Sequence, residues 1–159
     1  MQTLLSILAF VFATVLSAQN TYLHCGKLID TESGKVLTEQ TIIVSGNKIV
    51  SVEKGYKTPS NNEDTVIDLK SKTVMPGLID MHVHIESETN PKSYLEGYTL
   101  NDADVAFNSV QYAEVTLMNG FTTVRDLGGS GVNVSLRNAI NAGKVKGPRI
   151  FTAEKALAT

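Results

Sequence analysis

Short runs of β-branched and other apolar residues, separated by polar turn residues, fill the chain from Tyr22 to about Val74. Such runs predict β-strands, because branched and aromatic side chains suit a pleated, half-buried surface. Between two of the runs, Gly46 and Asn47 predict a tight hairpin in which both residues supply positive φ angles. The expected strands are residues 22–29, 41–44, 48–52, 65–68 and 73–75, and the polar stretch 57–64 is expected to be a loop.

Beyond residue 76 the periodicity changes to an alternation of short strands with helices. Asn101 or Asp102 can cap a helix that continues to about Asn119, because apolar residues recur there at spacings of three and four. Strand, helix and strand in alternation predict a parallel sheet with crossover helices. The expected second helix is 132–142, the expected strands are 121–126 and 149–152, and the expected loops are 85–99 and 127–129.

One predicted strand, which follows Pro76-Gly77, carries two histidines two positions apart. Side chains alternate between the faces of a strand, so His82 and His84 point the same way, with Asp80 on that face as well. At a strand rise of roughly 3.3 Å per residue their Cα atoms lie about 6–7 Å apart, and both imidazoles can converge on one metal ion. The opposite face is wholly apolar and is expected to pack on helices; it comprises Ile79, Met81, Val83 and Ile85.

The segment from Pro76 to His84 resembles the metal-ligand strand of the amidohydrolase superfamily: Pro-Gly, an apolar pair, and Asp-x-His-x-His. Residues 26–30, the hairpin and residues 66–69 resemble the same superfamily. Residues 121–129 and 147–150 resemble its imidazolonepropionase-like branch, which includes exported dipeptidases that act on Xaa-Pro dipeptides. A pair of histidines alone is weak support for a metal site. The open alternative is a strand that keeps the motif without the metal.

The resemblance implies an α/β fold: the N-terminal part of a (β/α)8 TIM barrel, preceded by strands of a small β-sandwich. In this interpretation residues 19–75 belong to the sandwich and residues 76–159 form the first strand–helix units of the barrel. A complete barrel needs about 250 residues, whereas the chain has 159. The barrel is therefore expected to be incomplete in this chain.

The resemblance also implies a metal-dependent hydrolase of C–N bonds, with His82 and His84 as ligands of a divalent metal. The expected metal is Zn²⁺, and the complete enzyme is expected to hold one or two ions. In the relatives a metal-activated hydroxide attacks an amide carbonyl, and further ligands come from later strands. Those later ligands have no counterparts here, and a catalytic zinc site wants three protein ligands. No catalytic residue and no other cofactor-binding residue is therefore assigned, and the chain is expected to be inactive alone.

A small peptide or amide is the expected substrate, with dipeptidase-like specificity. The alternatives left open are a cyclic-amide hydrolase, an N-acetyl deacetylase of the same superfamily, or a non-catalytic short relative. A net charge of −2 gives no basic surface for nucleic acid. A homo-oligomer is an option for the full-length form.

The first 18 residues predict a signal peptide: an apolar run over residues 4–16 ends in Leu16-Ser17-Ala18 before polar residues. Cleavage near Ala18 would export the protein to the periplasm or the extracellular space. The run is too short for a membrane-spanning helix of about 20 residues, so no stable membrane anchor is expected; the alternative is a buried N-terminal helix. The single cysteine, Cys25, cannot form an internal disulfide and is expected to pack as a small apolar side chain.

Four charged residues near the predicted strand ends have structural interpretations. Arg125 and Asp126 are expected to form an ion pair that holds the loop after their strand. Glu86 and Glu88 follow the histidine strand, and we expect both carboxylates to be solvated.

Overall fold

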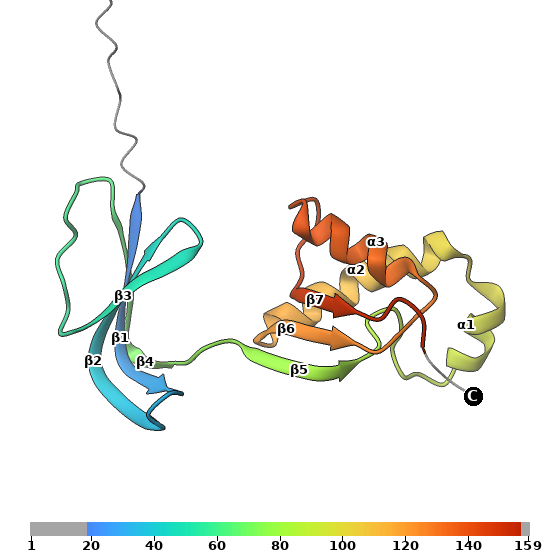
Figure 1. The fold of residues 1–159 in the computed structure, drawn as a ribbon, viewed down its shortest axis with the longest axis horizontal. Helices are drawn as coiled ribbons and strands as arrows, with labels where there is room; N and C mark the ends of the chain where they lie inside the picture. The colour runs from blue at the N-terminus through green and yellow to red at the C-terminus, as the bar shows by residue number, and fades with distance from the viewer. Residues whose placement is uncertain (1–18, 157–159) are drawn as a thin grey trace, which may run out of the picture. The chain divides into compact units, whose positions relative to one another are not determined.

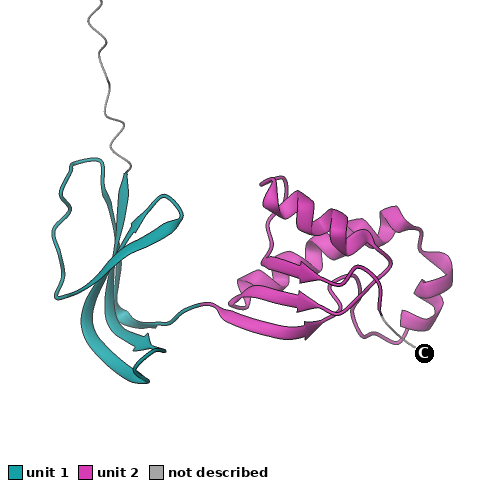
Figure 2. Cartoon of the chain, in the orientation of Figure 1, with its two compact units in different colours: residues 1–76 teal, residues 77–159 magenta. Residues whose placement is uncertain are grey.

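The computed structural model describes residues 19–156, so the predicted signal peptide lies outside the described residues. The chain forms two compact units, and the boundary between them along the sequence falls between Pro76 and Gly77 (Figure 2). Across residues 19–156, no helix has the length and apolar character needed to cross a membrane.

The first unit is one four-stranded sheet with the strand order β3-β2-β1-β4 (Figure 1). Strand β2 pairs antiparallel with both β1 and β3, whereas β1 and β4 pair in parallel. A small apolar cluster on the sheet contains Cys25, Leu28 and Ile42. The second sheet that a sandwich requires stays a prediction. The strands are β1 (Asn20–Asp30), β2 (Lys35–Ser45), β3 (Lys48–Lys54) and β4 (Thr65–Val74).

Strand β4 is continuous where the sequence predicts two short strands interrupted by polar residues. Its pairing with β1 shifts register between Cys25 and Lys27. A side chain at the intervening Gly26 would overlap the backbone carbonyl of Lys70. The missing Cβ therefore allows the polar segment of β4 to bulge against β1 and stay in the sheet.

Local predictions in this unit have mixed outcomes. Cys25 is fully buried in the apolar cluster, as predicted, and burial raises the pKa of its thiol. Of the two hairpin residues only Gly46 adopts a positive φ, 59°, so the role predicted for Asn47 is wrong. His24 lies against Tyr56, and its Nε2 hydrogen-bonds the carbonyl oxygen of Lys57 at 2.9 Å.

The second unit is a parallel sheet in the order β5-β6-β7, with helices between the strands (Figure 1). The fold class is mixed α/β, as predicted. The predicted bounds of the two long helices and the last two strands agree with the structure to within about two residues, but α1 lies in the predicted loop. The elements are β5 (Leu78–Val83), α1 (Ser93–Thr99), α2 (Asp102–Met118), β6 (Phe121–Asp126), α3 (Val132–Asn141) and β7 (Arg149–Thr152).

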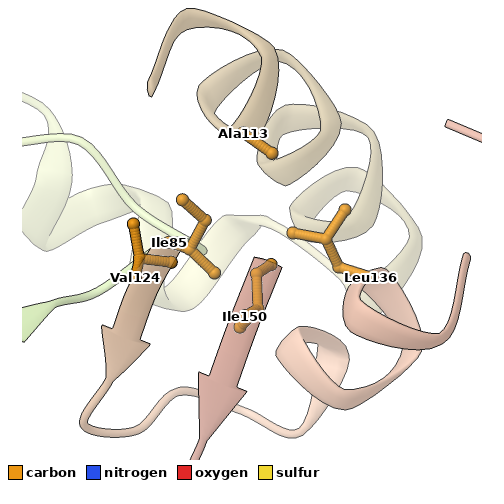
Figure 3. Close-up of a cluster of buried hydrophobic side chains, with 5 residues drawn as sticks. All are labelled: Ile85, Ala113, Val124, Leu136 and Ile150. Carbon is orange, nitrogen blue, oxygen red and sulfur yellow. The ribbon is translucent and has the colours of Figure 1, made fainter. Parts of the chain in front are cut away.

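The core of this unit lies between the sheet and helices α2 and α3 (Figure 3). Val124 and Ile150 come from the strands, Ala113 and Leu136 from the helices, and Ile85 from the segment after β5. Helix α2 starts with a reciprocal cap: the Asn101 side chain accepts from backbone N–H groups, and the Asp104 carboxylate accepts from the Asn101 N–H. This core fixes the strand ends on which the site is built.

Candidate functional site

The two histidines of the motif lie side by side at the carboxyl end of β5. His82 is the penultimate residue of β5, and His84 is the first residue after the end of that strand. Between and after them, Val83 and Ile85 pack into the core of the second unit. Alternation therefore directs both imidazoles to the other face, where they are exposed with ring centroids 5.6 Å apart.

A bulge in β5 separates Asp80 from the histidine face, contrary to the prediction. Asp80 pairs with Val124 and Val83 pairs with Asp126, so three steps along β5 match two along β6. Paired residues of neighbouring strands share a face, so Asp80 lies on the face of buried Val124. Its carboxylate accepts a hydrogen bond of 2.9 Å from the His82 backbone N–H.

The same bulge corrects the predicted apolar face. Ile79 pairs with Thr123, one residue away from buried Val124, and therefore lies on the opposite face. Ile79 and Met81 are 61% and 58% exposed. The predicted packing on helices is confirmed for Val83 and Ile85 and is wrong for Ile79 and Met81.

His84 is held by a backbone carbonyl from the next loop. Its Nδ1 lies 2.8 Å from the oxygen of Gly128, which follows β6. A carbonyl oxygen only accepts, so Nδ1 carries the proton and the Nε2 lone pair is free. This is the arrangement by which metal-binding histidines are commonly oriented.

Asp126 is buried, and it holds the loop after β6 without the ion pair to Arg125 that the sequence predicts. Its carboxylate accepts from the backbone N–H groups of Ile85 and Gly128, at 3.2 and 2.8 Å, and from the Asn133 side chain at 3.3 Å. Arg125 is exposed, and within residues 19–156 it forms no ion pair with Asp126. The predicted ion pair is wrong because alternation along β6 places the two side chains on opposite faces.

Glu86 is the functional-site residue that the sequence reasoning missed. It is half-buried, and its two carboxylate oxygens accept from the backbone N–H groups of Ser130 and Asn133, both at 2.6 Å. The predicted solvation is therefore wrong for Glu86. The start of α3 offered an indication of this contact. Its N-cap residue, Gly131, has no side chain to satisfy the free backbone N–H groups, so an acceptor from elsewhere is needed.

A hollow of about 250 Å³ opens beside His84. The carboxylates of Glu88 and Glu96 line it together with Tyr112. Burial raises the pKa of the Tyr112 phenol, and the negative charges of the two glutamates add to the shift. A larger hollow of about 680 Å³ borders the edge strand β7 and is lined by neither histidine.

The donor set fits a metal in part. Two adjacent imidazoles, one with its tautomer set by a carbonyl, suit a divalent transition metal. Over residues 19–156, however, no group of three or more histidine, cysteine, aspartate or glutamate side chains gathers in a way that could hold an ion.

The family model described as Amidohydrolase family matches residues 73–159, more than half of the chain. The chain belongs to the amidohydrolase family. This membership supports a hydrolase acting on C–N bonds, and enzymes of the superfamily typically use divalent metals. The motif that carries the predicted resemblance, at His82 and His84, lies inside the matched region.

Two solved structures and one curated relative are similar to the chain. A Xaa-Pro dipeptidase with methionine bound in its active site is 44% identical, with a TM-score of 0.80 over 88% of this chain and 34% of that protein. A prolidase in complex with N-methylphosphonate-L-proline is 34% identical, with a TM-score of 0.74 over 88% and 33%. Ochratoxinase from Aspergillus niger is 28% identical over 149 residues, 92% of this chain and 30% of the relative. The chain thus spans about a third of the length of these proteins.

Proposed function

We propose that this chain supplies the first metal ligands of an exported, metal-dependent dipeptidase that cleaves C–N bonds in Xaa-Pro or related dipeptides. The observation that carries the metal site is the pair of imidazoles at the end of β5, with His84 bonded through Nδ1 to Gly128. The dipeptide class is supported by the 44% identity to a Xaa-Pro dipeptidase.

In this proposal His82 and His84 would hold a divalent cation, with Zn²⁺ as the first candidate. When bound, such an ion supplies Lewis-acid activation of water and of the scissile carbonyl. The chain's own contribution is to orient the ligands: Val83 and Ile85 anchor the strand end in the core, and the Gly128 carbonyl holds the Nδ1 proton of His84. The strands around the site are, in this proposal, the first of a (β/α)8 barrel.

Turnover tests the proposal. We expect the protein in its natural length to hydrolyse an Xaa-Pro dipeptide, to lose activity on chelation and to regain it with Zn²⁺. We expect no turnover from the 159-residue chain alone, because two histidines fall short of the three protein ligands that catalytic zinc needs.

The same assay separates the alternatives. A cyclic amide and an N-acetylated amino acid are offered in parallel with the dipeptide. Preference for either would replace the dipeptidase assignment by another activity of the superfamily, and chelator-resistant hydrolysis would refute the metal role.

Export is a separate part of the proposal and has its own test. The apolar run before Ala18 supports cleavage there, because a short apolar segment followed by small residues is the substrate of signal peptidase. We expect N-terminal sequencing of protein from the periplasm or medium to begin at Gln19. Mature protein that retains Met1 would contradict the export proposal and leave the metal site unaffected.

A further inference from the structure

We propose that Glu86 is a positioning residue for His84: it holds the Gly128–Gly129 loop so that the Gly128 carbonyl fixes the proton of His84 on Nδ1. The proposal deepens the metal site and rests on the proposed function where it concerns metal binding. The tautomer itself is a property of the chain without metal.

The Glu86 carboxylate joins the segment after β5 to the start of α3. Its Oε2 accepts from the N–H of Ser130 and its Oε1 from the N–H of Asn133, each at 2.6 Å. Gly131, the N-cap residue of α3, provides no side-chain hydrogen bond. A carboxylate from outside the helix therefore satisfies backbone donors at its positive end, where negative charge is favoured.

Gly129 provides the space in which this carboxylate sits. A Cβ at Gly129 would overlap the carboxyl group of Glu86. No positive φ requires a glycine at this position, so the close approach of Glu86 is the physical reason for the missing side chain.

The peptide of Gly128 is held on the other side by buried groups. Its N–H donates to Asp126 at 2.8 Å, and the N–H of Gly129 donates to the Glu154 carbonyl at 2.9 Å. The side chain of Asn133 donates to both Asp126 and the Glu154 carbonyl, at 3.3 and 2.9 Å. With Glu86 bound to Ser130, every residue from Gly128 to Ser130 has its N–H engaged, and the direction of the Gly128 carbonyl is set.

The consequence for His84 follows from the hydrogen bond of its ring to Gly128. The Gly128 oxygen lies 2.8 Å from Nδ1 and accepts its proton, which leaves Nε2 unprotonated. A metal ligand must offer an unprotonated nitrogen. Loss of Glu86 removes one of the three hydrogen bonds that hold the N–H groups of residues 128–130, so the Gly128 carbonyl is held less firmly and we expect His84 to exchange between both tautomers.

The test reads the ring nitrogens of histidine by NMR in the metal-free 159-residue chain, labelled with ¹⁵N-histidine. The chain has three histidines, and His24 is an internal reference because its Nε2 faces the Lys57 carbonyl and must carry the proton. We expect His84 to show the opposite pattern, with the proton on Nδ1.

Two variants disturb the same contact from both sides. Glu86→Gln keeps the volume but turns one acceptor into a donor that faces a backbone N–H, and Gly129→Ala pushes the carboxyl group aside. In each we expect the His84 signals to move to a mixture of tautomers while those of His24 stay unchanged. Glu88→Gln is the matched control, because the hydrogen bonds of Glu88 to Asn90 and Ser93 run through its backbone carbonyl.

Three outcomes overturn the proposal: a wild-type His84 without the Nδ1 proton, a wild-type tautomer retained in both variants, or the same change in the Glu88→Gln control. In the natural-length protein, Glu86→Gln should also weaken metal affinity by about 10–100-fold, the usual cost of losing a partner of a metal ligand. A tautomer change without any metal binding, even in the wild type, would refute the proposed function and leave the positioning role of Glu86 standing.

Discussion

Replacement of His82 by asparagine is expected to remove metal and hydrolytic activity together from the protein in its natural length. The imidazole of His82 lies beside that of His84, and no third group of metal-binding type joins them within residues 19–156. Loss of one of two neighbouring ligands should lower activity by more than about 100-fold, since even partners of metal ligands contribute 10–100-fold. Elemental analysis and dipeptide hydrolysis, measured on the same preparation, check this result.

The matched control is His24→Gln, in the first unit. A glutamine side chain can still donate to the Lys57 carbonyl that His24 contacts, so the fold of that unit should persist. The control should keep wild-type metal content and activity. Wild-type metal content in the His82→Asn protein would show that His82 is not a ligand.

Truncation of Leu136 to alanine is expected to lower the free energy of unfolding of the second unit by about 2–5 kcal/mol, the usual range for a buried leucine. Leu136 is 4% exposed and packs between α3 and the strands, in the same cluster as Val124 and Ile150 (Figure 3). The loss combines the transfer free energy of the removed methyl groups with that of the remaining cavity.

Amide hydrogen exchange distinguishes this local effect from a general one. Protection should fall in β6 and β7 and stay unchanged in β1–β4, because the two units have separate apolar clusters. Ser135→Ala, an exposed neighbour on the same helix, should change stability by no more than about 0.5 kcal/mol. Equal losses in both variants would show that the burial of the Leu136 side chain is not the source of the loss.

Burial separates the carboxylates that the sequence could not distinguish. Glu86 and Glu88 stand two positions apart after the same strand, yet of the two only Glu86 reaches backbone donors among residues 19–156, those of Ser130 and Asn133. These donors lie 44 and 47 residues further along the chain. Local sequence cannot show such a contact, because it depends on how β6 brings its following loop beside the end of β5.

The sequence by itself determined the elements whose signals are local. Periodicity predicted α2, α3 and the strands around them, and the motif at Pro76–His84 predicted the family that the comparison confirms. Only the tertiary structure decided what depends on neighbouring strands. The bulge that separates Asp80 from the histidines arises from pairing with β6. The proton on Nδ1 of His84 likewise depends on a carbonyl from another loop. Side-chain direction and hydrogen-bond partners across a sheet are set by register, which no single strand encodes.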